Sequence, residues 1–338
     1  MVKKAICSYY NISLNKSQLK IYKKNFLGLR GDNIHCYFIL RNDKVKHRVF
    51  GKIASNNQQE YHNLQYLIKN IPKKDISLPR PIALLKNGDY SLLLLEYLEG
   101  YSNPFSAIHS VYPFNERIFK ILKVGKNVLN KIYRLQKHFQ ISYSPLTLYD
   151  TDGIPNQPKP VSIFKQLESV QSISDEIKAK LENKINEILK NRIMVRRGMI
   201  HGDLGLRNII INSSKISFID WDCMQHQGTS LLDPCYFVTL LLMRSVQLLI
   251  PKTKANIISE SLFQHIKQLE ERLTETKYEN FISDGIWFGK CIAITDTLWW
   301  YEQERHNNFV NALIKRRNHQ IKYLAYHLEK VAKNEHCQ

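Results

Sequence analysis

Hydrophobic positions follow two different periods in the two parts of the chain. Cys36–Leu40 and Arg48–Ala54 are short apolar runs bounded by polar residues, which is the pattern of β-strands. The stretch from Glu60 places Leu64, Leu67 and Ile68 at helical spacing. Asp89–Gly100, DYSLLLLEYLEG, is expected to be a buried strand that runs into a polar tail. The first hundred residues therefore predict a sheet with one helix.

Beyond Gly100 the apolar residues recur mainly at helical spacing. Asn115–Phe139 predicts a long amphipathic helix, and Phe164–Asn191 predicts a second helical region. Further helices are expected at Pro234–Leu249, Leu262–Leu273, Phe281–Tyr301 and Phe309–Ala332. The change of pattern predicts a boundary near Gly100, which divides the chain into residues 1–100 and 101–338.

One stretch of strand pattern interrupts the helical part. Two β-rich runs, Ile209–Ile211 and Ile216–Ile219, flank the polar turn Asn212–Lys215 and predict a hairpin. A hairpin with a short turn brings its outer ends together, so Asn208 and Asp220 are expected to be neighbours.

The polar residues around this hairpin suit phosphoryl transfer. Mg²⁺ prefers a few carboxylate and amide oxygens, and Asn208 and Asp220 supply one of each, with Asp222 as further support. Asp203 lies on the loop just upstream and could accept the proton of an attacking hydroxyl. Its spacing to Asn208, Asp-x-x-x-x-Asn, is that of the kinase catalytic loop.

The motifs resemble one family of enzymes. His201-Gly202-Asp203-Leu204 with Asn208, followed by Phe218-Ile219-Asp220-Trp221-Asp222, is similar to the phosphotransferase family of aminoglycoside phosphotransferases and choline kinases. The resemblance implies Asp203 as the catalytic residue, Asn208 and Asp220 as metal ligands, and His201 as a structural brace. Asp233-Pro234 resembles the Asp-Pro element of the same family.

The resemblance also implies that residues 1–100 form a nucleotide-binding lobe, and it assigns roles to residues within it. Lys52 in a strand and Glu60 on the next helix are the pair that positions nucleotide phosphates in kinase-like folds. Glu96, Tyr97 and Leu98 match the hinge pattern, whose backbone hydrogen-bonds adenine.

Three further residues have weaker support. Gly28 and Gly31 precede a strand, where backbone N–H groups of a glycine-bearing turn could approach phosphates, although a plain hairpin turn explains them equally well. Arg207 lies between Asp203 and Asn208 and could offset charge on the transferring phosphoryl group, with a surface arginine as the alternative.

Composition narrows the class of partner. The chain has 338 residues, is 43% hydrophobic and carries a net charge of +19, which attracts anions unless it only reflects a lysine-rich composition. Nucleic acid or an anionic membrane surface is a further partner that this charge allows, without support from a motif. Six scattered cysteines with no C-x-x-C pair and no signal peptide predict a cytoplasmic protein with reduced thiols.

Together these observations predict an α+β, two-lobed protein kinase-like fold, with a small antiparallel-sheet lobe and a larger, mostly helical catalytic and acceptor-binding lobe. The expected activity is Mg²⁺-dependent transfer of the γ-phosphate of ATP, or another nucleoside triphosphate, to a hydroxyl. The expected acceptor is a small molecule, preferably anionic, such as a sugar, a polysaccharide precursor or a lipid headgroup. A protein kinase and a catalytically silent nucleotide-binding scaffold are the alternatives.

Overall fold

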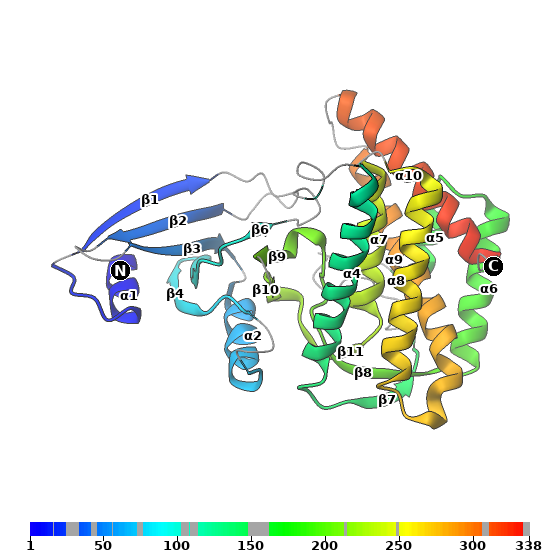
Figure 1. Cartoon of the computed structure of the whole chain (residues 1–338), viewed down its shortest axis with the longest axis horizontal. Helices are drawn as coiled ribbons and strands as arrows, with labels where there is room; N and C mark the ends of the chain where they lie inside the picture. The colour runs from blue at the N-terminus through cyan, green and yellow to red at the C-terminus, as the bar shows by residue number, and fades with distance from the viewer. Residues whose placement is uncertain are drawn as a thin grey trace. The chain divides into compact units, whose positions relative to one another are not determined.

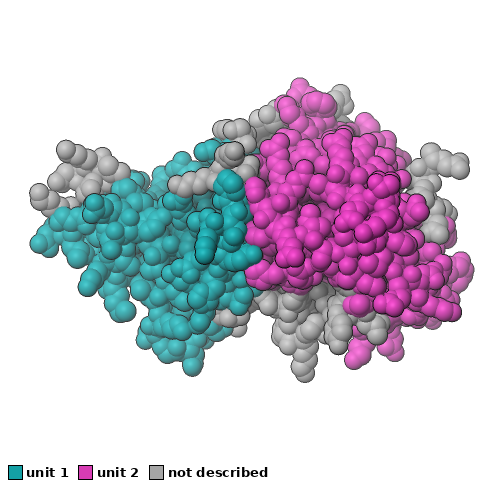
Figure 2. Space-filling view, turned by 90° about the horizontal axis from the view of Figure 1, so that it is seen from below, with its two compact units in different colours: residues 1–101, 209–222 teal, residues 102–208, 223–338 magenta. Residues whose placement is uncertain are grey.

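The chain forms two compact units in a computed structural model. The structure describes residues 1–15, 17–24, 34–41, 46–55, 57–72, 77–102, 108, 114–147, 162–212, 215–247, 250–305 and 311–333. Unit 1 comprises Met1–Tyr101 and Ile209–Asp222, and unit 2 comprises Ser102–Asn208 and Cys223–Gln338 (Figure 2).

Unit 1 is built on an antiparallel five-stranded sheet with the order β1-β2-β3-β5-β4 (Figure 1). Its strands are β1 (Gln18–Lys24), β2 (Ile34–Arg41), β3 (Lys46–Ala54), β4 (Pro81–Asn87) and β5 (Tyr90–Glu96). The central strand β3 pairs with β2 on one side and with β5 on the other. A central strand is held by hydrogen bonds along both edges, so it is a firm support for a functional side chain.

One face of this sheet is closed by a short helix that the sequence pattern did not reveal. Helix α1 (Val2–Tyr9) buries Ile6 and Cys7 in a cluster with Cys36, Phe38 and Leu40 of β2. A Cβ atom at Gly51 would lie 2.6 Å from both Cys36 Sγ and a Phe38 ring carbon, so Gly51 faces the same cluster. Because side chains alternate along a strand, Lys52 points to the opposite face.

The opposite face carries helix α2 (Asn57–Asn70), whose Glu60 meets Lys52. The predicted hairpin also belongs to unit 1. The hairpin consists of β9 (Ile209–Asn212) and β10 (Lys215–Phe218), with Ile209 opposite Phe218. By its contacts it groups with unit 1, whereas we expected it in the C-terminal part. The reason lies in bonds to unit 1, including one from Asn63 Nδ2 on α2 to the carbonyl oxygen of Trp221 at 2.6 Å.

Unit 2 is mainly helical, as the spacing of its apolar residues predicts. Its helices are α4 (Phe114–Gln136), α5 (Ile163–Ser169), α6 (Asp175–Lys190), α7 (Leu232–Gln247), α8 (Lys252–Glu271), α9 (Ile282–Arg305) and α10 (Asn311–Ala332). Helix α7 packs against α8 and α9, and α9 packs against α10 (Figure 1). A small antiparallel sheet, β7 (Ser142–Pro145), β8 (Met194–Ile200) and β11 (Gln225–Thr229), has β8 at its centre.

The helical region predicted at Phe164–Asn191 is divided into two helices, because the chain leaves the helical conformation between α5 and α6. Val170 is extended, and Ser174 caps α6 by accepting a hydrogen bond from the N–H of Ile177. Glu302 of α9 accepts hydrogen bonds from the N–H groups of Gln171 and Ser172 at 2.8 and 3.0 Å. These hydrogen bonds provide partners for the backbone N–H groups between the two helices. The periodicity of apolar residues gives no sign of them.

The architecture is therefore α+β, with an antiparallel sheet unit and a larger helical unit. Within the described ranges, no helix is long and apolar enough to cross a membrane.

A buried ion pair holds the small sheet of unit 2 against its helices. Arg196 of β8 donates from Nε to Glu270 Oε2 at 3.1 Å and from Nη2 to Glu270 Oε1 at 2.8 Å. Nη2 also donates to Gln136 Oε1 of α4 at 2.8 Å. Arg196 and Glu270 are almost fully buried, so each depends on the other for its charge balance.

Replacing Arg196 alone is expected to destabilise the protein strongly. Arg196→Met leaves the Glu270 carboxylate buried without its partner, which should lower the free energy of unfolding by about 3–5 kcal/mol. The double variant Arg196→Met/Glu270→Leu removes both charges and should recover much of that loss. Urea unfolding followed by circular dichroism measures both variants. Equal losses in the single and double variants would contradict the interpretation.

Candidate active site

A buried lysine is the centre of the polar site in unit 1. Lys52 Nζ lies 2.9 Å from Glu60 Oε2 and 2.5 Å from Asp220 Oδ1. A third carboxylate oxygen, Oδ2 of Asp222, lies at 3.9 Å. Lys52 is 5% exposed and Glu60 is 1% exposed, so this pairing is shielded from water. The structure thus brings together the lysine, the helix glutamate and the acidic residues that follow the hairpin.

Two asparagines fix the backbone around this lysine. Asn57, at the start of α2, donates from Nδ2 to the carbonyl oxygens of Lys52 at 2.8 Å and Ser91 at 2.7 Å. Asn63, further along α2, donates to the carbonyl oxygen of Trp221. The strand, the helix and the segment after the hairpin are therefore tied by hydrogen bonds independent of the charged groups.

Asp220 has an unusual backbone conformation. Its φ is +66°, in the left-handed region that an aspartate tolerates better than most residues. The buried indole of Trp221 next to it donates to the carbonyl oxygen of Phe218 at 2.9 Å, which closes a tight turn at the end of β10. The turn directs the carboxylate of Asp220 to Lys52, at a conformational cost of about 1–3 kcal/mol.

The electrostatics of the site favour a charged lysine. Burial alone would lower the pKa of Lys52, but the carboxylates of Glu60, Asp220 and Asp222 outweigh it and raise the pKa above its ordinary value. Burial raises the pKa of Glu60, and the ammonium of Lys52 opposes that rise. With all four groups ionised, one positive charge faces three negative charges, an excess of two negative charges.

His35 is a member of this site that sequence reasoning missed. It lies directly opposite Lys52 in the β2–β3 register, a relation that only strand pairing reveals. Burial lowers its pKa, the ammonium of Lys52 lowers it further, and Asp220 partly opposes the change. The imidazole is therefore neutral at pH 7.

The loop predicted to be catalytic belongs to unit 2 and follows β8 in the chain. Asn208 Nδ2 donates to the backbone oxygen of Asp203 at 2.8 Å and lies 3.4 Å from its Oδ2 atom. The N–H of Gly205 also donates to the Asp203 carbonyl at 2.8 Å, which curls the loop. Because the amide nitrogen of Asn208 is used within the loop, its side-chain oxygen is the atom that could bind a metal.

Asp233 anchors the same loop from α7. Its carboxylate accepts hydrogen bonds from the N–H groups of His201 at 2.6 Å and Gly202 at 3.0 Å. His201 is buried, and its Nδ1 atom lies 3.3 Å from the N–H nitrogen of Asp203. Gly202 has φ +83°, and a Cβ there would collide with the carbonyl oxygen of Cys223. The sequence pointed to the Asp-Pro element only by resemblance. The structure shows that Asp233 holds the backbone of this loop at His201 and Gly202.

Arg207 is the exposed member of the loop. Its Nη2 atom lies 3.6 Å from Asp203 Oδ2, and 57% of its side chain is exposed. An ion pair this exposed contributes little to stability. The geometry leaves the guanidinium free to move, and its catalytic role stays a prediction.

The residues predicted to form a hinge begin with Glu96, the last residue of β5. Both its backbone N–H and its carboxylate already have hydrogen-bond partners. Its N–H donates to the Arg80 carbonyl at 2.8 Å, and its Oε1 atom accepts from the Tyr9 hydroxyl at 2.8 Å. The backbone N–H that could reach adenine must therefore belong to a later residue, and Tyr97 and Leu98 are the next two. Their role stays a prediction, and Gly28 and Gly31 lie outside the residues that the structure describes.

The low pKa of His35 predicts how stability depends on pH. An unfolded histidine binds a proton near pH 6.5, whereas folded His35 does so only at lower pH, so unfolding takes up a proton. The free energy of unfolding is therefore unaffected by His35 above about pH 6.5, and it decreases as the pH falls below that value. Thermal melting between pH 7.5 and 5 should show a smaller acid loss for His35→Gln than for the wild type.

The control for this measurement is His62→Gln, the same change at an exposed position of α2. It is expected to keep the pH dependence of the wild type. An identical acid loss in His35→Gln and the wild type would show that the histidine titrates alike in both states.

Comparisons with known proteins agree with this architecture. The model of the RIO domain, a protein kinase-like family, matches residues 162–230, about a fifth of the chain. No curated protein sequence matches the chain.

Solved structures resemble this chain along its whole length. One is a thermostable mutant of aminoglycoside phosphotransferase APH(4)-Ia in ternary complex with AMP-PNP and hygromycin B, and its TM-score with this chain is 0.53. It has 11% sequence identity, and the match covers 100% of this chain and 99% of that one. A structure of aminoglycoside phosphotransferase APH(4)-Ia itself gives the same TM-score and identity, with 99% and 98% covered. The resemblance seen in the motifs is confirmed at the level of the fold: the chain has the kinase-like fold of these phosphotransferases.

Proposed function

We propose that this protein transfers the γ-phosphate of a nucleoside triphosphate to a hydroxyl group of a small molecule. The observation that carries the proposal is the buried contact of Lys52 with both Glu60 and Asp220. A purely structural ion pair would need one carboxylate, whereas this lysine faces three, two of them on the segment that follows the hairpin. The fold supports the same class of reaction, because structures similar to it belong to phosphotransferases.

The charge at the site suits a divalent cation. Three carboxylates around one ammonium leave about two negative charges to be balanced, and carboxylate and amide oxygens are the ligands that Mg²⁺ prefers. We assign Asp220 and Asn208 as the metal ligands, with Asp222 supporting them. When bound, the metal neutralises charge on the β- and γ-phosphate oxygens.

Lys52 is assigned to the nucleotide phosphates. Its position is set by Glu60. Its contact with Asp220 would weaken if that carboxylate held a metal ion. The ammonium could then donate a hydrogen bond to a phosphate oxygen, while its hydrogen bond to Glu60 would keep it oriented.

Asp203 is assigned to the acceptor. Its carboxylate lies on the loop anchored by Asp233, and Asn208 and Arg207 both approach its Oδ2 atom. In this role it orients the attacking hydroxyl and accepts its proton as the bond to phosphorus forms. The loop's internal hydrogen bonds keep the carboxylate in a fixed orientation, which is how an enzyme gains rate by positioning.

The net charge of +19 favours an anionic acceptor. Hygromycin B is bound by the similar enzyme, but a polycationic acceptor would be repelled by the charge of this chain. Sugar phosphates, polysaccharide precursors and lipid headgroups are the acceptor classes that we propose to screen first.

A protein acceptor is the second candidate, and the RIO domain match favours it. The two candidates differ in a direct experiment with labelled ATP. Transfer to a small acceptor labels a small molecule or a lipid, whereas a protein kinase labels a protein in a mixture of cell proteins.

Asp203→Asn is expected to lower turnover by about 10²- to 10⁴-fold, because the variant cannot accept the proton of the acceptor. Nucleotide binding should be largely retained, since Lys52, Glu60 and Asp220 are unchanged. Release of ADP measures turnover, and titration calorimetry measures nucleotide binding.

The matched control is Asp175→Asn, which removes one carboxylate from a fully exposed side chain in the same unit. It should keep the activity of the wild type. Turnover by Asp203→Asn close to that of the wild type would exclude the assigned role.

A further inference from the structure

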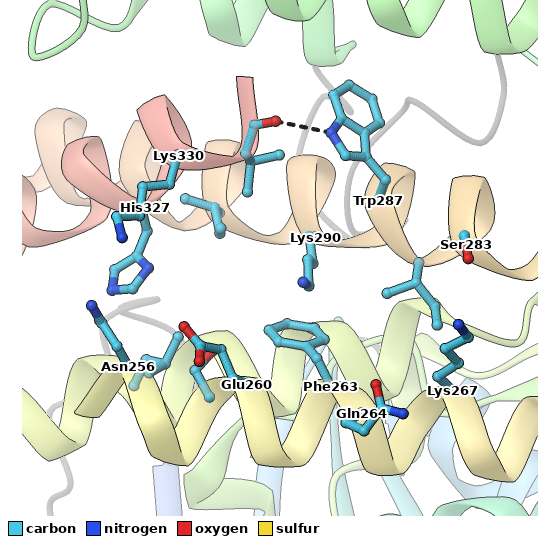
Figure 3. A pocket seen from close by; sticks show the side chains of 15 residues that line it. Asn256, Glu260, Phe263, Gln264, Lys267, Ser283, Trp287, Lys290, His327 and Lys330 are labelled. Atoms are coloured by element: carbon cyan, nitrogen blue, oxygen red, sulfur yellow. Dashed lines mark hydrogen bonds between the residues drawn. The ribbon is translucent and has the colours of Figure 1, made fainter. Parts of the chain in front are cut away.

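Unit 2 contains a pocket that the proposed reaction does not use. It has a volume of about 480 Å³, within the range of small-molecule sites, and lies among α8, α9 and α10 (Figure 3). Helix α8 contributes Asn256, Glu260 and Phe263, which are three or four residues apart and so lie on one face. Trp287 and Lys290 line it from α9 at the same kind of spacing.

The pocket and the catalytic loop lie on different faces of α7. A Cβ atom at Gly205 of the loop would lie 3.8 Å from Leu240 Cδ1, so Leu240 faces the loop. Leu242, two positions later, lines the pocket. Two residues along an α-helix turn the side chain by about 200°, so the pocket lies on the opposite face of this helix from Asp203 and its loop.

Two aromatic walls of the pocket are held in place before any ligand binds. The ammonium of Lys290 lies 4.1 Å from the centre of the Phe263 ring, a cation–π contact between α9 and α8. The indole of Trp287 donates to the carbonyl oxygen of Val331 at 3.0 Å, which ties α9 to α10 (Figure 3). Both rings are largely buried. Ordered aromatic walls reduce the conformational entropy that binding would otherwise remove.

The polar groups of the pocket favour an anion. Lysines 267, 290 and 330 line it together with one carboxylate, that of Glu260, so these four side chains carry a formal charge of +2. Lys267 also lies 3.9 Å from Glu271, which does not line the pocket. The apolar part of the lining, including Leu242, Ile286 and Ile294, can cover an uncharged body. Small-molecule sites combine such an apolar surface with a few polar groups that fix orientation.

We propose that this pocket is a second ligand site, which binds a small organic anion with a compact apolar or aromatic body. The anionic group, a phosphate monoester or a carboxylate, lies beside Lys290, and the other two lysines add positive charge to the pocket. The ring or apolar part lies against Trp287 and the aliphatic side chains of the lining. The ligand would contact three helices of unit 2 at once and hold them together.

The test uses phenyl phosphate and benzoate as probes on the full chain, with benzyl alcohol as the uncharged control. Titration calorimetry at low and high salt should show saturable binding of at least one anion, weaker at high salt, and much weaker binding of benzyl alcohol. Lys290→Gln should weaken anion binding by about tenfold or more, because it removes a charged partner. Binding should persist with saturating ATP, which occupies the nucleotide site.

A matched control separates the pocket from general charge effects. Lys277→Gln removes a lysine from the same unit whose ammonium also lies over a ring, that of Tyr278 at 4.8 Å, but which does not line the pocket. It should bind the anions as the wild type does. Equal weakening in both variants, displacement by ATP, or the absence of saturable binding of either anion would overturn the proposal.

A second variant fills the pocket instead of changing its charge. Ser259→Leu adds apolar volume at a buried lining position, and its melting temperature without ligand shows whether it folds. In a folded variant, binding of the anions should be lost. Wild-type affinity in folded Ser259→Leu would contradict the assignment, and if Lys290→Gln does not fold, Lys330→Gln replaces it with the same expectation.

Discussion

The contact between one buried ammonium and the carboxylates around it organises the site in unit 1. Lys52 reaches Glu60 on a helix and Asp220 after a hairpin more than one hundred residues later in the chain. Removing Lys52 would leave the buried carboxylate of Glu60 without its partner, a change that costs about 3–5 kcal/mol in buried ion pairs. The helix, the central strand and the end of the hairpin are therefore held to one arrangement by electrostatics as well as by packing. The excess of two negative charges around Lys52 is the feature on which the proposed divalent cation rests.

Local patterns predicted the parts of this site that depend on short-range sequence. Two β-rich apolar runs on either side of a polar turn located the hairpin. The positions of Lys52 and Glu60 followed from a strand and the helix after it. The pattern could not show that His35 lies opposite Lys52, because strand register is set by pairing between distant segments. It also could not show that α1 closes the other face of the sheet, since eight residues are too few for a clear helical period.

The helical unit shows where periodicity alone is insufficient. Every expected helix is present, but the break between α5 and α6 depends on a cap at Ser174 and on the carboxylate of Glu302, a residue of another helix. The buried pair of Arg196 and Glu270 likewise joins a strand to a helix far along the chain. Such tertiary partners decide where polar groups can be buried. The sequence likewise offered no motif for the pocket among α8, α9 and α10.

The central claim is that Asp220 exchanges its bond to Lys52 for a metal that carries a nucleotide. Thermal stabilisation by ATP, with and without Mg²⁺, tests it in the wild type, in Asp220→Ala, and in Asp89→Ala as an exposed control in the same unit. A nucleotide at a hundred times its dissociation constant should add about 2.7 kcal/mol of stability. The account predicts this Mg²⁺-dependent stabilisation in the wild type and in Asp89→Ala, and its loss in Asp220→Ala. Stabilisation of equal size in Asp220→Ala, or none in the wild type, would contradict it.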